Sequence, residues 1–186
     1  MKRIILAISA VMAFIAVNAQ NTVTTNWPNG NKKSEGMVIG DAKISSSDTK
    51  EEQARKMGAE VKDGKWTTWF ENGSLRSEEY YSNGTMVGTW KSVYENGQTE
   101  AILDFTSGKA VYYNKNGVIS SEGTIASGMI YKGEWTGYYE NGTKNYKGSY
   151  DNEGRKDGVW TWWDEKGNVV NEQVFKNGTL LSTKSK

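Results

Sequence analysis

Residues 133–150 read GEWTGYYENGTKNYKGSY, and this stretch decides the fold. Its centre is the dipeptide Asn141-Gly142, which stands between two runs of β-forming residues. Asn-Gly in this setting is a strong hairpin signal, because asparagine and glycine tolerate the positive φ angles of a two-residue type I′ turn. The stretch therefore predicts two antiparallel strands joined by a tight turn.

The same pattern recurs along the chain. Five turn dipeptides end in glycine at spacings of 24, 20, 25 and 25 residues: Gly73, Gly97, Gly117, Gly142 and Gly167. Seven residues before each glycine stands a second column: Trp66, Trp90, Ala110, Trp135 and Trp160. A further turn closes each unit, so residues 64–186 predict five hairpin repeats with a C-terminal cap. The predicted fold class is all-β, an elongated single-layer antiparallel meander of about eleven strands and about 50 Å in length.

The region before these repeats departs from the pattern. Residues 20–43 contain Asn29-Gly30 and are interpreted as a partial repeat that caps the sheet. Residues 44–63 form an insertion in which Asp48 and Glu51 make a helix capping box. We expect one short inserted helix there. It is either a docking element or, in the interpretation we favour, a surface insertion over the first strands.

Hairpin pairing predicts which side chains share a face of the sheet. The residue seven before the turn glycine pairs with the one six after it, and nine before pairs with eight after. The tryptophan column then shares a core face with the column at plus eight: Tyr81, Phe105, Ile125, Tyr150 and Phe175. Each of these faces a glycine, which leaves its ring room, and Leu75, Ile119 and Val169 are expected on the same core side. The opposite side is expected to carry Thr67, Arg76, Glu78, Lys91, Glu100, Glu122, Lys147 and Glu172.

One column of mostly aromatic residues runs through the polar side, four residues before each turn glycine: Trp69, Val93, Tyr113, Tyr138 and Trp163. If strand alternation is regular, this stripe is exposed, with members about 10 Å apart because two strands separate them. It is the candidate binding site, suited to a protein strand, a peptide or stacked sugar rings. The alternative, which we favour because the residues recur with the repeat, is that the stripe braces a single-layer sheet.

The first nineteen residues are typical of a secretory signal peptide. Lys2 and Arg3 precede an apolar run over residues 4–16, and small or apolar residues precede Gln20. The run is shorter than the roughly 20 residues that span a bilayer, so we expect cleavage before Gln20 rather than an uncleaved anchor. No integral membrane span is then expected, and the mature protein is expected to be bacterial and exported, either periplasmic or extracellular. The chain has a formal charge of +1, and near-neutrality argues against nucleic acid as a partner.

The available side chains limit the chemistry. The chain has no Cys and no His, which excludes disulfides, Ser-His-Asp and Cys-His nucleophile systems and the usual zinc ligand sets. The glutamates occupy repeat positions, so we expect no enzyme activity, no metal and no cofactor. Asp151, Glu153 and Asp157 cluster in one loop and could touch Ca²⁺, but Arg155 stands where an EF-hand needs an oxygen ligand.

The combined pattern resembles a known repeat family. Gly-x-Trp is followed by two aromatic residues, such as Trp69-Phe70 or Tyr138-Tyr139, then by Glu-Asn-Gly, then by Glu and an aromatic residue. This resembles the MORN repeat variant (membrane occupation and recognition nexus, type 2), well over residues 64–178 and partly over residues 29–40. Proteins with this variant are commonly labelled YwqK-type antitoxins of toxin-antitoxin pairs, and MORN repeats in general are linked to protein scaffolding and phospholipid contact.

The resemblance and the predicted export together suggest a non-catalytic protein-interaction scaffold of the bacterial cell envelope. The expected partner is another envelope protein. One alternative is an antitoxin-like protein that binds and neutralises a toxin. A second alternative is glycan binding along the stripe.

Overall fold

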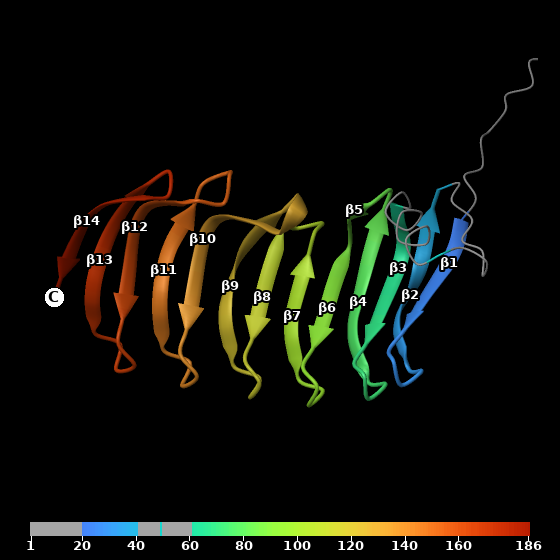
Figure 1. Cartoon of the computed structure of the whole chain (residues 1–186). Coiled ribbons are helices and arrows are strands. Elements are labelled where there is room, and N and C mark those ends of the chain that lie inside the picture. Colours follow the sequence, from blue (N-terminus) through green and yellow to red (C-terminus); the bar gives the residue numbers. More distant parts are fainter. Residues whose placement is uncertain (1–19, 41–48, 50–60) are drawn as a thin grey trace, which may run out of the picture.

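The strands of the protein lie side by side in one open layer (Figure 1). The computed structural model describes residues 20–40, residue 49 and residues 61–186. All pairings between strands are antiparallel, and the strands follow their order in the sequence across the sheet, apart from one short strand that pairs on one side only. The prediction of an all-β, single-layer antiparallel meander is confirmed.

The described residues form fourteen strands. They are β1 (Gln20–Asn26), β2 (Lys32–Ile39), β3 (Val61–Trp69), β4 (Leu75–Ser82), β5 (Thr85–Met86), β6 (Thr89–Val93), β7 (Thr99–Asp104), β8 (Lys109–Tyr113), β9 (Ile119–Ala126), β10 (Ile130–Tyr138), β11 (Lys144–Tyr150), β12 (Lys156–Trp163), β13 (Val169–Lys176) and β14 (Thr179–Ser185). The short β5 pairs only with β4, and the other thirteen follow one another across the sheet. At about 4.8 Å per strand, the sheet is about 58 Å long.

Helical structure is limited to one 3-10 turn in the described part of the chain, η1 (Ser127–Met129). The predicted inserted helix falls on residues that lie outside the described ranges, apart from Thr49. The predicted signal peptide, residues 1–19, also lies outside them. Strand β1 begins at Gln20, and β1 and β2 form a complete hairpin where the sequence predicted a partial one.

The turns that set the repeat have three loop residues. In the first full repeat, the Phe70 amide donates to Ser74 O at 2.9 Å and the Gly73 amide donates to Phe70 O at 2.9 Å. Gly73 has a φ of 84°, but the φ angle of Asn72 is not positive. The predicted type I′ turn is therefore wrong here. Asn72 Oδ1 accepts the Ser74 amide at 2.9 Å, which stabilises a three-residue loop with a left-handed glycine in third place.

Two positive φ angles in succession occur instead in some of the turns between hairpins. Asn83 and Gly84 have φ of 47° and 75°, and Asn177 and Gly178 have 50° and 83°. The Asn83 amide donates to Asp63 Oδ1 at 3.0 Å. These turns therefore have the two positive φ angles that were predicted for the Asn-Gly pairs inside the hairpins.

A β-bulge follows each three-residue loop and alters the predicted faces near the turns. Between β3 and β4, Thr68 pairs with Ser77 but Trp69 pairs with Leu75, so Arg76 is an extra residue. Beyond the bulge the predicted register holds, since Trp66 pairs with Glu79. The same shift occurs in all six hairpins that the described residues form.

Two predictions about faces are corrected by these bulges. Leu75, Ile119 and Val169, which were expected in the core, pair directly with the stripe residues Trp69, Tyr113 and Trp163. Directly opposed residues share a face, so these three lie on the stripe side. Arg76 and Glu100, which were expected on the polar side, are the extra residues of their bulges and line hollows with residues of the tryptophan face.

The tryptophan column lies in the interior of the other face, named here the tryptophan face. Trp135 and Trp160 are each 1% exposed. Each tryptophan indole donates to a main-chain oxygen of the preceding strand, for example Trp135 Nε1 to Thr124 O at 3.0 Å. Aromatic rings of the plus-eight column pack on both sides, as Tyr81 and Phe105 do at 4.9 and 5.0 Å from Trp90. Burying these rings is the main stabilising contribution in a sheet that has no second layer among the described residues.

Candidate functional site

The predicted stripe lies on the face opposite the tryptophans, close to the row of three-residue turns. All five of its residues are half-buried. Tyr138 OH donates to Glu122 Oε1 at 2.8 Å, and Lys32 Nζ lies 5.6 Å from the Trp69 ring centroid. Burial and this hydrogen bond raise the pKa of Tyr138. Two of the stripe rings, Tyr138 and Trp69, therefore have polar neighbours, and part of each stripe side chain remains accessible.

The bulges widen the stripe into a band two residues across. The directly opposed residues are Leu75, Thr99, Ile119, Lys144 and Val169. Leu75 is 42% exposed. Together the stripe and these five partners form a surface named here the band. Most of its members are apolar or aromatic, and they recur with the repeat.

The tryptophan face departs from its repeat pattern in one region. The residue opposite a tryptophan is glycine at Gly36, Gly123 and Gly148, where a Cβ atom would collide with the ring. At the corresponding positions of the first two full repeats stand Glu79 and Leu103, and Ala110 replaces the next tryptophan. These departures leave space on the sheet.

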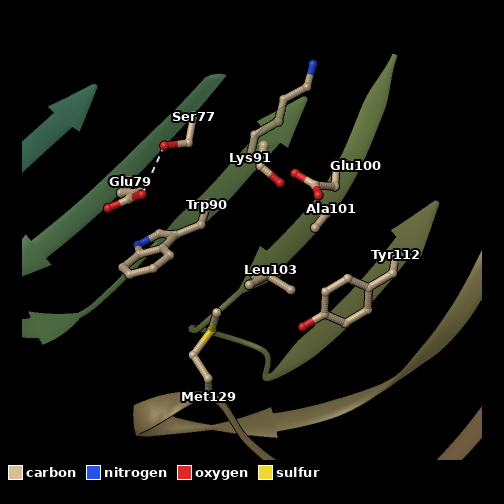
Figure 2. Close-up of a pocket in the computed structure, with 10 residues that line it drawn as sticks. Ser77, Glu79, Trp90, Lys91, Glu100, Ala101, Leu103, Tyr112 and Met129 are labelled. Carbon is tan, nitrogen blue, oxygen red and sulfur yellow. Dashed lines mark hydrogen bonds between the residues drawn. The ribbon is translucent and has the colours of Figure 1, made fainter. Parts of the chain in front are cut away.

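A hollow of about 290 Å³ occupies that space (Figure 2). Its floor is formed by the small residues Ser77, Ser92 and Ala101, and its walls by Trp90, Leu103, Tyr112 and Met129. Glu79 stands at one end, and Figure 2 shows Lys91 extending away from the other side chains. Lys91 and Glu100 complete the lining. This set of residues is named here the hollow.

Glu79 is held in place by hydroxyl groups. Ser77 Oγ donates to Glu79 Oε1 at 2.9 Å, and Tyr81 OH donates to Glu79 Oε2 at 2.9 Å. Lys62 Nζ lies 3.6 Å from Oε2, and its side chain lies over the rings of Trp66 and Tyr81. Burial, followed by the bond to Glu79, raises the pKa of Tyr81 well above its usual value. Glu79 also borders two adjoining hollows of about 330 and 320 Å³.

The acidic loop that was considered for Ca²⁺ is an ion-pair cluster. Arg155 Nε lies 2.8 Å from Asp151 Oδ2, and the same guanidinium pairs with Glu153. Lys176 Nζ lies 3.2 Å from Asp157 Oδ1. The hydrogen bonds from Arg155 hold the pKa of Asp151 below its usual value. In the described residues, no three His, Cys, Asp or Glu side chains are grouped so that they could hold a metal ion.

The hollow was missed in the sequence, and a signal for it was present. Glu79 and Leu103 stand where other repeats have Gly36, Gly123 and Gly148, and Ala110 interrupts the tryptophan column. Ala110 was placed in the tryptophan column, and no role was predicted for Glu79 or Leu103. As for membrane spans, the described part of the chain contains no helix that is both long and apolar enough to cross a bilayer.

Comparison with known proteins identifies the repeats. The family model described as "MORN repeat variant" matches residues 62–83, 86–106, 131–152 and 156–177. No protein in the curated set matches the chain. The gap between the second and third matches contains Ala110, Tyr112 and Met129, so the segment that breaks the family pattern supplies part of the hollow.

Proposed function

Because the chain carries four repeats of the MORN variant, a non-catalytic kind of repeat that generally binds proteins or membranes, we propose that it is a protein-interaction scaffold. We place it in the bacterial cell envelope, exported by residues 1–19, with another envelope protein as its partner. The scaffold presents the band to that partner. The observation that carries this proposal is the regular, partly exposed apolar band on one face of an open sheet.

The physical support comes from the geometry of the band. A sheet about 58 Å long offers one residue pair every two strands, about 10 Å apart. Such a spacing suits a long partner that makes several weak contacts rather than one deep contact. Partly exposed Trp, Tyr and Leu side chains supply the apolar anchors that protein interfaces favour.

The test uses the full chain, expressed in its own source bacterium and captured from the envelope fraction. We expect Leu75→Glu combined with Val169→Glu to abolish co-purification of the partner, because two charges would be buried in an apolar contact. Leu180→Glu is the matched control, since Leu180 is 48% exposed and pairs with Phe175 on the tryptophan face. Equal recovery of the partner by the band variant and the wild type would contradict the proposal.

The two alternatives that the sequence raised predict different results. A toxin partner would co-purify as one protein in a fixed ratio and would lose its toxicity when bound. Glycan binding would appear as a change of tryptophan fluorescence on titration with envelope polysaccharides, and Trp69→Ala with Trp163→Ala would abolish it.

Fractionation and N-terminal sequencing test export. We expect the mature chain to begin at Gln20, and a cytosolic chain that retains Met1 would refute export.

A further inference from the structure

The hollow gathers three departures from the repeat at one place. Glu79 replaces a glycine, Ala110 replaces a tryptophan, and Met129 adopts a left-handed backbone with a φ of 64°. A non-glycine residue in this conformation is strained and persists only where its surroundings impose it, and such strain is frequent at binding sites. Met129 lies at the rim of the hollow and is 40% exposed. The three features together leave an opening toward solvent.

Two carboxylates line the hollow, and one of them, Glu79, is paired with Lys62. The other is Glu100, and Lys91 is the one basic residue of the described lining. Figure 2 shows the Lys91 side chain directed away from Trp90, Leu103 and Tyr112. Glu100 also borders a neighbouring hollow with Arg76 and Lys115, and Glu79 borders two adjoining hollows. Figure 2 shows Glu79 next to the Trp90 ring, so Glu79 is the carboxylate that stands beside an aromatic wall of this hollow. Lys62 Nζ approaches Oε2 of Glu79, whereas Oε1 is the oxygen that accepts the hydrogen bond from Ser77 Oγ.

The walls suit the apolar part of a cation. Trp90 and Tyr112 are aromatic, and aromatic faces attract organic cations through the ring quadrupole. Leu103, Ala101 and Met129 offer aliphatic and thioether contacts for a hydrocarbon stem. A volume of about 290 Å³ is at the lower end of small-molecule sites and exceeds what a bare metal ion needs.

We propose that the hollow is a binding site for an organic cation, an ammonium or guanidinium group carried on an apolar stem. The head group lies at Glu79 beside Trp90, and the stem lies along Leu103 and Met129 toward Tyr112. The ligand is either the side chain of a lysine or arginine in a protein or a free alkyl amine. The site is on the face opposite the band, and it stands whether or not the band binds a partner.

The test is calorimetric titration of the chain from Gln20 to Lys186 with probes of matched size. N-acetyl-lysine methylamide, N-acetyl-arginine methylamide and 1,4-diaminobutane are the cations, and N-acetyl-norleucine methylamide is the neutral control. We expect the cations to bind and norleucine to bind at least about tenfold more weakly, as loss of a charge-assisted hydrogen bond implies. Tighter binding of the capped amino acids points to a protein side chain, and tighter binding of the diamine points to a free amine.

Two variants locate the site. Glu79→Gln keeps an acceptor for Ser77 and Tyr81 but removes the charge, and we expect about tenfold weaker binding of the cations. Glu78→Gln is the control, because Glu78 is adjacent in sequence but pairs with Thr67 on the other face. Ala101→Leu fills the floor without touching Glu79 and is expected to abolish binding. Equal affinity for lysine and norleucine probes, or unchanged affinity in both Glu79→Gln and Ala101→Leu, would overturn the proposal.

Discussion

At the scale of single residues, the glycines of this chain do two different jobs. Gly64, Gly88, Gly133 and Gly158 have φ between 63° and 75°, so they are required by the backbone conformation. The sequence had explained them as space for the aromatic rings opposite. The glycines that make space for rings are Gly36, Gly123 and Gly148, which lie under Trp66, Trp135 and Trp160.

This distinction gives a prediction for Gly148→Ala. The backbone at Gly148 suits any residue, but the added methyl group would overlap the Trp160 indole. We expect a loss of about 1–3 kcal/mol in the free energy of unfolding, measured by urea denaturation, as for other overpacked cores. Ser149→Ala, at an exposed neighbouring position, is the control and should change stability little. A loss of stability below that of the control would show that the ring is free to move.

At the scale of the hairpin, the turn asparagines connect neighbouring repeats. Asn141 Nδ2 donates to Glu165 O at 3.1 Å, and Asn96 Nδ2 donates to Lys115 O at 3.1 Å. Tyr139, three residues before the turn glycine Gly142, also connects neighbouring repeats, since its OH donates to Trp163 O at 2.7 Å. A hairpin alone is marginally stable, so these bonds add to ring packing in holding the row of turns together.

Asn141→Asp separates the two roles of the turn asparagine. The aspartate oxygen still accepts the Thr143 amide, as Asn141 Oδ1 does at 2.9 Å, but the donor to Glu165 is lost and a carboxylate faces a carbonyl. We expect a loss of about 1 kcal/mol in the free energy of unfolding. Asn116→Asp is the control, because in the described structure the Asn116 side chain donates to no other hairpin. Equal effects of the two changes would contradict the bridging role.

At the scale of the whole molecule, the protein behaves as a linear array. Strands pair only with their neighbours in the sheet, and side-chain rings reach the next strand but one, as Tyr112 of β8 does to Trp135 of β10. Stability is therefore expected to be a sum of repeats and of interfaces between them. Trp135 and Trp160 stand 25 residues apart and meet equivalent glycines, Gly123 and Gly148. One repeat can therefore be removed without changing the junction.

We expect deletion of residues 133–157 to leave a folded, shorter sheet. Lys132 would then precede Gly158, and Trp160 would lie on Gly123 as Trp135 does. The measurement is urea denaturation, with a smaller m-value because less surface is exposed on unfolding. Deletion of thirteen residues, half a repeat, is the control and should unfold the chain, because it reverses the strand direction at the junction. Two equally unstable deletions would refute the array description.

The sequence alone determined the architecture, because a period of 20 to 25 residues between turn glycines requires two strands and two turns in each repeat. It also placed the tryptophan column and the register beyond the bulges, since strand alternation and pairing follow from the turn position. The face of Leu75, the extra position of Arg76 and the hollow beside Glu79 were decided only in the tertiary structure. Each depends on a three-residue loop offset by a bulge, or on side chains that meet from strands of different repeats, and neither is visible in the spacing of residues along one hairpin.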